Sequence, residues 1–211
     1  IEDIDSPRTK SWAVRQAIDD LQWLGLDWDE GPNRPGFHAP YLQTERLESY
    51  KMALERLSLE ERVYPCTCSR TDIAEAASAP HWDHEGPIYP LSCAHRRAAE
   101  ADRIEGSYAW RYRCLEGEWS FIDGYRGLQS CEVSAELGDF VVAKKEGNPA
   151  YQLAVVVDDH AMQITEVVRG DDLLASTFRQ LQLYSTFGWS PPKFYHVPLV
   201  VGPDGKRLAK R

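Results

Sequence analysis

The spacing of apolar residues in the first sixty positions predicts two helices. One is expected over residues 8–25, where apolar side chains recur at helical spacing: Trp12, Ile18, Leu21 and Leu24. Gly25 follows as a stop signal. The second helix is expected over residues 44–59, with Thr44 as its N-cap. A loop rich in proline and glycine, residues 31–40, separates the two helices.

Unbroken apolar runs in the last third of the chain predict strands of a parallel sheet. The runs 153–157 and 164–168 each end in a polar cluster, and 195–201 leads into a Gly-Pro turn. Such runs suit strands that are buried on both faces. A helix is expected between the second and third runs, over residues 173–187. This alternation describes an open α/β sheet, in which ligands bind beyond the carboxyl ends of the strands.

The middle of the chain has a different character. Residues 66–97 mix a short helix with a loop rich in proline and histidine, and strand-like runs follow over residues 108–114, 119–122 and 140–143. We therefore expect an α/β fold in three segments. Residues 1–63 and 150–211 form the main domain, and residues 64–149 form a smaller α+β insertion.

Charge and hydropathy exclude several classes of protein. With 24 basic and 33 acidic residues the formal charge is −9, so any RNA contact must be local, because affinity for phosphates comes mainly from Lys and Arg. No apolar run approaches the length of a membrane span. The first residues are acidic and give no sign of a secretory signal. A soluble, cytoplasmic monomer is expected.

The five cysteines favour a metal site over disulfides, because their number is odd and no signal peptide accompanies them. A close pair and a third cysteine 25 residues later could meet at a tetrahedral Zn²⁺ of structural type: Cys66, Cys68 and Cys93. Tyr89 and His95 are the candidates for a fourth ligand, and His81 and His84 are less well placed. The alternative is three buried free cysteines, which are common in protein cores.

Two further features could recognise anionic groups. Residues 205–211 hold four cations after a turn, which suits either a solvated tail or a mobile loop that neutralises a polyphosphate. Tyr151 and Arg169 each stand at one end of a predicted strand. An Arg fork binds a carboxylate and would select an acidic substrate. The alternative for Arg169 is a structural ion pair with Asp171 or Asp172.

The chain resembles a class I synthetase family, the glutamyl-tRNA synthetases and their shorter paralogues. The motifs of that family occur here in the same order. Residues 1–8 resemble the Arg-Ile-Glu-Asp motif, and residues 150–160 look like the matching central strand. Residues 168–180 are similar to the segment that follows it, and residues 207–211 align with the Lys-Met-Ser-Lys-Ser loop. The three consecutive valines at 155–157, the Arg-Gly-Asp-Asp-Leu-Leu run and the Cys-x-Cys…Tyr-x₃-Cys pattern most resemble the glutamyl-queuosine branch.

The resemblance implies a Rossmann-like nucleotide-binding fold interrupted by a zinc-containing insertion. It also implies a ligase that activates glutamate with ATP and Mg²⁺ and transfers it to the queuosine base of tRNA(Asp). Glu2 would face the substrate ammonium, Arg169 would pair with a carboxylate, and Tyr151 would hydrogen-bond it. The family's zinc ligands would be Cys66, Cys68, Tyr89 and Cys93, with Tyr89 as phenolate.

The resemblance further implies that Lys210 contacts ATP and is catalytic, within a signature loop made of Arg207, Leu208, Ala209, Lys210 and Arg211. Two positions of this loop depart from the family pattern, since Arg207 replaces a Lys and Ala209 replaces a Ser. The ATP-holding His-Ile-Gly-His motif, with the first strand and helix, would lie before residue 1. The chain by itself is therefore expected to be inactive.

Two alternatives remain open. One is a truncated glutamyl-tRNA synthetase that charges tRNA(Glu), whose zinc site can end in Cys-x-His, a form that residues 93–95 also satisfy. The other is a non-catalytic RNA-binding module derived from a synthetase.

Overall fold

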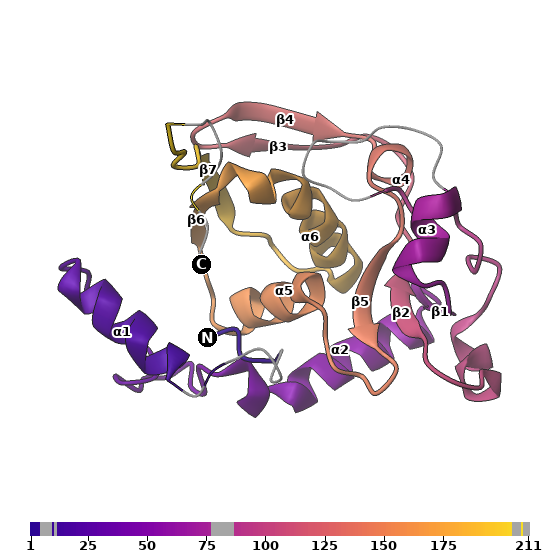
Figure 1. Ribbon diagram of the computed structural model, residues 1–211, viewed down its shortest axis with the longest axis horizontal. Helices are drawn as coiled ribbons and strands as arrows, with labels where there is room; N and C mark the ends of the chain where they lie inside the picture. The colour runs from indigo at the N-terminus through magenta and orange to yellow at the C-terminus, as the bar shows by residue number, and fades with distance from the viewer. Residues whose placement is uncertain (5–9, 11, 77–86, 204–207, 209–211) are drawn as a thin grey trace.

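The computed structural model describes residues 1–4, 10, 12–76, 87–203 and 208 (Figure 1). Helices α5 and α6 lie at its centre, with α2 beneath them and the β3–β4 hairpin above. The elements, in chain order, are α1 (Ala13–Trp23), η1 (Gln43–Glu45), α2 (Leu47–Leu59), β1 (Val63–Cys66), α3 (Arg70–Ala76), η2 (Ala98–Arg103), β2 (Ala109–Tyr112), β3 (Trp119–Asp123), β4 (Gly127–Cys131), α4 (Val133–Glu136), β5 (Phe140–Lys144), α5 (Tyr151–Ala161), β6 (Glu166–Gly170), η3 (Asp171–Leu173), α6 (Leu174–Phe187) and β7 (Lys193–Val197).

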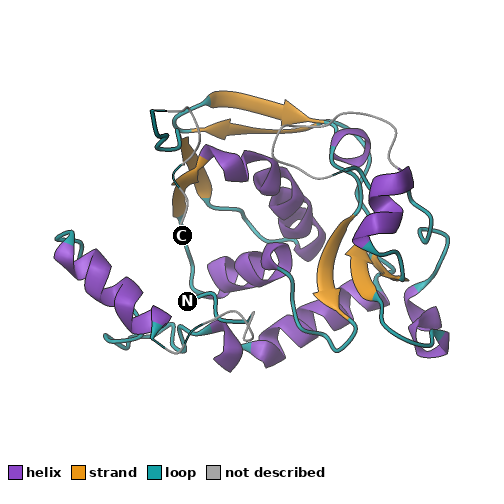
Figure 2. Cartoon of the chain, in the orientation of Figure 1, coloured by secondary structure: helices purple, strands orange, loops and turns teal. Residues whose placement is uncertain are grey.

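The strands form three small sheets around the helices (Figure 2). Strands β1, β2 and β5 make an antiparallel sheet, and β3 pairs with β4 in a hairpin. The strand-like runs predicted in the middle of the chain are therefore confirmed. Strands β6 and β7 pair in parallel and are connected through α6, so the last third of the chain contains the expected βαβ unit. This sheet has two strands, and the expectation that the run 164–168 is buried on both faces is wrong, because Val168 is 69% exposed.

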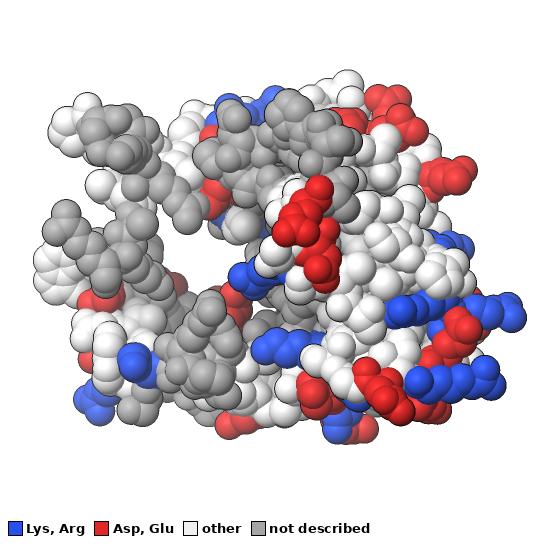
Figure 3. Space-filling model, turned by 45° about the vertical axis from the view of Figure 1, so that its right-hand side comes forward, with Lys and Arg blue, Asp and Glu red and all other residues white. Residues whose placement is uncertain are grey.

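Helix α1 is shorter than predicted, and it packs only weakly against the rest of the described chain: Val14 and Ile18 are half-buried, and Leu21 and Trp23 are exposed. None of its residues is buried, and the side chains of Trp23 and Leu24 are 85% and 63% exposed. Figure 1 shows this helix projecting from the body of the molecule. The face drawn in Figure 3 carries acidic and basic side chains close together. Within the described residues, no helix has the length and apolar character needed to cross a membrane.

The start of α2 differs from the prediction. Thr44 lies in the η1 turn and does not cap the helix, which begins at Leu47 without a side-chain cap. Instead, Asp3 accepts hydrogen bonds from the backbone N–H and the hydroxyl of Thr44, at 2.9 and 2.6 Å. Asp3 is buried, so this contact fixes the first residues of the chain against the segment that leads into α2.

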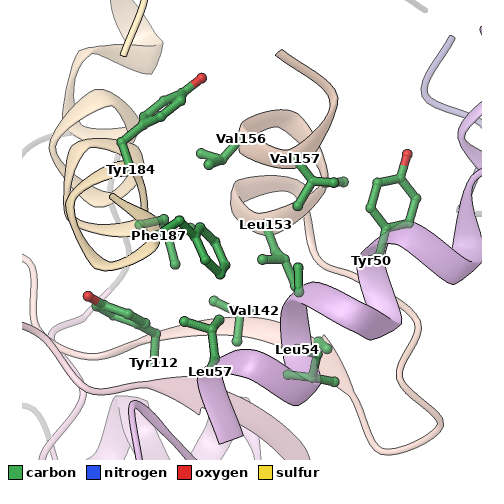
Figure 4. Close-up of a cluster of buried hydrophobic side chains, with 14 of the residues drawn as sticks. Tyr50, Leu54, Leu57, Tyr112, Val142, Leu153, Val156, Val157, Tyr184 and Phe187 are labelled. Carbon is green, nitrogen blue, oxygen red and sulfur yellow. The ribbon is translucent and has the colours of Figure 1, made fainter. Parts of the chain in front are cut away.

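The main hydrophobic core lies where α2, α5 and α6 meet the β1–β2–β5 sheet (Figure 4). Residues from all three segments defined from the sequence contribute to it; the division into domains itself stays a prediction. Its fully buried members labelled in Figure 4 are Tyr50, Leu57, Tyr112, Val142, Leu153 and Val156.

The prediction of a strand over residues 153–157 is wrong, because this run lies inside helix α5. The buried positions are 153, 154, 156 and 157, a spacing that forms one face of a helix. A short apolar run of this length has no periodicity that separates a buried strand from a buried helix, and its three valines favoured the strand. Tyr151 therefore begins a helix and does not stand at the end of a strand.

The two faces of α5 predict different responses to the same substitution. Val156→Ala removes two methyl groups from a fully buried side chain and should lower the free energy of unfolding by roughly 1–3 kcal/mol. Val155→Ala should cost less, because Val155 is half-buried and alanine favours helix formation. Urea unfolding of both variants measures the difference; a larger loss for Val155→Ala would contradict the helical assignment.

Candidate functional site

The guanidinium of Arg169, near the end of β6, lies in a network of uncharged side chains. Its Nε donates to Nε2 of His196 at 3.0 Å, and its Nη2 donates to Oγ1 of Thr177 at 2.6 Å and to Oε1 of Gln180 at 2.9 Å. Its Nη1 donates to the hydroxyl of Tyr151 at 3.3 Å. A guanidinium has five N–H donors, so one Nη1 hydrogen keeps no acceptor among the described residues.

These acceptors are supplied by helices α5 and α6 and by strand β7. Thr177 and Gln180 stand three residues apart on α6, a spacing that places both on one helix face. The ring of Phe194, on β7, lies beneath the guanidinium at 5.2 Å, which suits a cation–π contact. Gln180 is in turn held by Gln152, to which it donates at 3.0 Å. The guanidinium is therefore fixed in orientation.

His196 is fully buried and makes a second strong contact. Its Nδ1 lies 2.6 Å from Oδ2 of Asp123, which is the last residue of β3 and is also buried. Burial opposes ionisation of Asp123, but backbone N–H groups, led by that of Arg126, and the imidazole hold its pKa at about 2. Burial is also the main cause that lowers the pKa of His196. The pair is thus an aspartate beside a neutral imidazole.

Sequence reasoning did not single out Asp123 or His196. His196 lies within a predicted apolar strand, where a lone histidine gives no signal, and Asp123 precedes a glycine turn 73 residues earlier. Among the described residues, Arg169 forms no ion pair with Asp171 or with Asp172, the alternative considered from the sequence. Asp171 pairs with Arg126, and the four hydrogen-bond acceptors of Arg169 are all uncharged.

An acidic pocket of about 300 Å³ lies between the first residues, the loop after α1, and α5. Its lining includes four carboxylates: Glu2, Glu30, Asp158 and Asp159. Glu2 is exposed, and its charge raises the pKa of both Tyr151 and Asp159, behind burial as the first cause. Three predicted site residues that are far apart in the sequence, Glu2, Tyr151 and Arg169, therefore lie close enough for the charges of Glu2 and Arg169 to act on Tyr151.

The two aspartates at the end of α5 point to different partners. Asp158 accepts from Gln43, Arg46 and Tyr50 at 2.7–2.9 Å, which ties α5 to η1 and α2. Asp159 accepts from the hydroxyl of Tyr184, on α6, at 3.5 Å and interacts electrostatically with Arg169. Burial raises the pKa of Asp159 to about 6, and the charge of Arg169 opposes that shift.

A second site gathers the thiols of Cys66, Cys68 and Cys93, whose sulfur atoms all lie within 4.8 Å of one another. The Sγ atoms of Cys68 and Cys93 are 3.7 Å apart. The hydroxyl of Tyr89 lies 3.4 Å from the Cys66 sulfur and 3.8 Å from the Cys68 sulfur. His95 is exposed and is not part of this group.

The donor set of this cluster fits a zinc ion. A tetrahedral site with Zn–S bonds of about 2.3 Å requires sulfur atoms roughly 3.8 Å apart, close to the separation of Cys68 and Cys93. Burial raises the pKa of Tyr89, so its phenol would ionise only beside a cation. Within the described residues, these three cysteines are the group of Cys, His, Asp or Glu side chains whose ligand atoms lie close enough together to hold a metal ion.

Part of the predicted site falls outside the described residues: Arg207, Ala209, Lys210 and Arg211, together with His81 and His84. Leu208, the described member of the predicted signature loop, is exposed and donates its backbone N–H to the carbonyl of Val200 at 2.9 Å.

Comparison with known proteins identifies the family. The whole chain, residues 1–211, matches the family described as tRNA synthetases class I (E and Q), catalytic domain. The chain belongs to this family. The class I synthetase fold is shared with a glutamate-tRNA synthetase from Elizabethkingia anophelis, whose structure superimposes with a TM-score of 0.81 at 29% identity and covers 99% of this chain.

Relatives of this class I synthetase domain include proteins named Glutamyl-Q tRNA(Asp) synthetase. The one from Rhodopirellula baltica is 48% identical over 222 residues, and the one from Symbiobacterium thermophilum is 51% identical over 217 residues. Both alignments cover the whole of this chain. The chain spans 65% and 66% of the length of these relatives, and 44% of the Elizabethkingia anophelis synthetase.

The raised pKa of Asp159 makes a prediction about pH. Its folded-state pKa of about 6 exceeds the ordinary value of about 3.9, so between these pH values the folded state binds more protons than the unfolded state. The free energy of unfolding therefore falls as pH rises through this window. Asn does not titrate, so the free energy of unfolding of Asp159→Asn should not fall in this window. The stability of the variant relative to the parent should therefore rise between pH 4 and pH 7, on the order of 1–3 kcal/mol.

Urea unfolding of parent and variant at several pH values measures this difference. A stability difference that stays constant from pH 4 to pH 7 would show that Asp159 is not perturbed in the folded state.

Proposed function

We propose that this chain is the catalytic core of an enzyme that activates glutamate with ATP and transfers it to the queuosine base of tRNA(Asp). The observation that carries the proposal is the half-buried guanidinium of Arg169, which is held by uncharged partners that include Tyr151. It interacts electrostatically with Asp159, one of the carboxylates that line the acidic pocket. The names of the relatives that align with the whole chain support the choice of product.

The charge pattern of the site suits an amino acid with an acidic side chain. The remaining Nη1 hydrogen of Arg169 and the hydroxyl of Tyr151 would both donate to the side-chain carboxylate of glutamate. Burial raises the pKa of Tyr151, which keeps its phenol protonated as a donor. The carboxylates of Glu2 and Asp159 would face the substrate ammonium, whose positive charge they attract.

Activation needs no side-chain nucleophile, because the α-carboxylate of glutamate is already ionised at neutral pH. One of its oxygens bonds to the α-phosphorus of ATP while the bond from that phosphorus to pyrophosphate breaks. The resulting glutamyl adenylate then acylates the queuosine base and AMP leaves. Catalysis consists of positioning and of stabilising charge on the leaving group. We assign the second role in part to Lys210, and Mg²⁺ would accompany ATP as part of the substrate.

We assign a structural zinc ion to Cys66, Cys68, Cys93 and the phenolate of Tyr89. The ion would cross-link the end of β1 to the segment around Tyr89 and Cys93, and would ionise its ligands. Burial raises the pKa of the Cys68 thiol to about 11, so a nearby cation is required for it to be a thiolate at neutral pH.

The contact with tRNA is expected to be local, because the chain carries a net charge of −9 and the face drawn in Figure 3 carries both signs. The queuosine enzyme and a glutamyl-tRNA synthetase activate glutamate in the same way. They differ in the RNA that accepts the glutamate, which is the queuosine base of tRNA(Asp) in one and tRNA(Glu) in the other.

The function is tested by glutamate-dependent ATP–pyrophosphate exchange in the complete enzyme. Arg169→Ala should raise KM for glutamate by roughly 10- to 100-fold and leave KM for ATP unchanged, because a hydrogen bond to a charged group contributes about 1.5–3 kcal/mol. Lys210→Ala should instead lower the exchange rate by about 10²- to 10³-fold. An Arg169→Ala enzyme that saturates at the parent glutamate concentration rejects the carboxylate clamp.

The acceptor is tested with labelled glutamate and tRNA from cells with and without queuosine. We expect label on tRNA(Asp) only when queuosine is present. Label on tRNA(Glu) would favour the glutamyl-tRNA synthetase alternative, and a complete absence of exchange would favour the non-catalytic module.

The metal proposal predicts the zinc content of the purified complete enzyme. Elemental analysis should find about one zinc per chain in the parent and in Cys131→Ser, whose thiol is buried away from the cluster. Cys93→Ser should lose zinc and lower the melting temperature, because metal binding contributes directly to folding. Equal zinc content in both variants would refute the assigned ligands.

A further inference from the structure

We infer that Asp123 and His196 are positioning residues that orient the Arg169 guanidinium through one fixed tautomer of the histidine. The inference rests on the proposed function, in which Arg169 recognises the substrate carboxylate. Neither residue touches the substrate in this account; each acts through Arg169.

The tautomer of His196 follows from the hydrogen-bond partners of its two ring nitrogens. Nε2 lies 3.0 Å from Oγ1 of Thr177, a hydroxyl that can donate or accept, and 3.0 Å from Nε of Arg169, which is a donor and never an acceptor. The contact with Arg169 decides the tautomer, so Nε2 must carry a lone pair. Nδ1 lies 2.6 Å from the carboxylate of Asp123, so Nδ1 must carry the hydrogen. The imidazole is therefore neutral, with its proton on Nδ1.

The orientation of Asp123 is fixed by the backbone. Its Oδ1 accepts from the N–H groups of Tyr125 at 3.0 Å and Arg126 at 2.8 Å, and the N–H of His196 reaches both of its oxygens at 3.1–3.2 Å. The carboxylate thus joins the turn of the β3–β4 hairpin to strand β7. The hairpin, within the segment predicted to be an insertion, is connected in this way to the substrate-binding arginine.

The neutral imidazole preserves the charge of Arg169. A carboxylate in direct contact with the guanidinium would form a strong bidentate pair and compete with the substrate. Here the imidazole of His196 stands between the carboxylate of Asp123 and the guanidinium. Among the N–H groups of Arg169, the imidazole accepts only from Nε–H. The Nη1 hydrogen stays available to a ligand.

Replacing Asp123 by Asn should reverse the tautomer. The amide oxygen of the new side chain belongs at the Oδ1 position, where three backbone N–H groups converge, so its NH₂ group faces Nδ1 of His196. Nδ1 must then accept, and the proton moves to Nε2. Oγ1 of Thr177, 3.0 Å from Nε2, can accept the new Nε2–H. Nε of Arg169 would then face a donor in place of its acceptor, and the guanidinium must turn away.

The first test is direct and does not depend on activity. Long-range ¹H–¹⁵N NMR of the complete enzyme, with the signal of His196 assigned by its loss in His196→Gln, should report the Nδ1–H tautomer at neutral pH. The Nε2–H tautomer or a protonated ring would overturn the inference, whatever the variants do.

The second test uses the kinetics of pyrophosphate exchange to distinguish a positioning role from a general loss of folded structure. Asp123→Asn and His196→Leu should each raise KM for glutamate at least about tenfold, with KM for ATP and zinc content unchanged. His196→Gln should stay within about threefold of the parent, because its amide oxygen can take the place of Nε2 as acceptor. Asp102→Asn, an exposed change in the same segment, is the matched control and should behave as the parent.

The outcomes distinguish this inference from the proposed function. If Arg169→Ala raises KM for glutamate but Asp123→Asn and His196→Leu do not, Arg169 recognises the substrate without their help and the positioning role is wrong. If Arg169→Ala itself leaves KM unchanged, the proposed function fails first.

Discussion

The half-buried positive charge of Arg169 is the constraint on which the arrangement of this site depends. A guanidinium partly removed from water is destabilising unless its donors are satisfied. In this domain four of the five donors are met by neutral acceptors, and the ring of Phe194 lies below. This requirement explains the burial of polar side chains that a simple core would exclude: Thr177, Gln180 and His196. Because no acceptor carries a charge, the site keeps its attraction for an anion.

The elements around this charge are held by the same kind of buried polar contact. Asp158 fixes α5 to α2 through three donors, Asp3 fixes the first residues beside α2, and Asp123 fixes the hairpin to β7. These contacts join segments that are 41 to 115 residues apart in sequence. The end of helix α5 links the acidic pocket to the guanidinium. There Asp158 accepts from donors in η1 and α2, and Asp159, which lines the pocket, interacts electrostatically with Arg169.

Sequence reasoning reached the family, the cysteine cluster and the Tyr151–Arg169 contact because each depends on residue identity in a recognisable order. Helix α6 (Leu174–Phe187) was also predicted closely, over residues 173–187. The run at 153–157 was misassigned because a short, fully apolar segment has no period and its fate is decided by tertiary packing. Asp123 and His196 were missed for a related reason: their importance comes from a contact across 73 residues, which local patterns do not contain.

The most direct measurement of the central claim is the calorimetric affinity of the complete enzyme for glutamate and for glutamine. The two ligands have nearly the same shape and differ in the charge of the side chain, so their comparison isolates the guanidinium. The account predicts that glutamate binds more tightly by on the order of tenfold or more, since a charge-assisted hydrogen bond is about twice as strong as a neutral one. Equal affinity for glutamate and glutamine would contradict it.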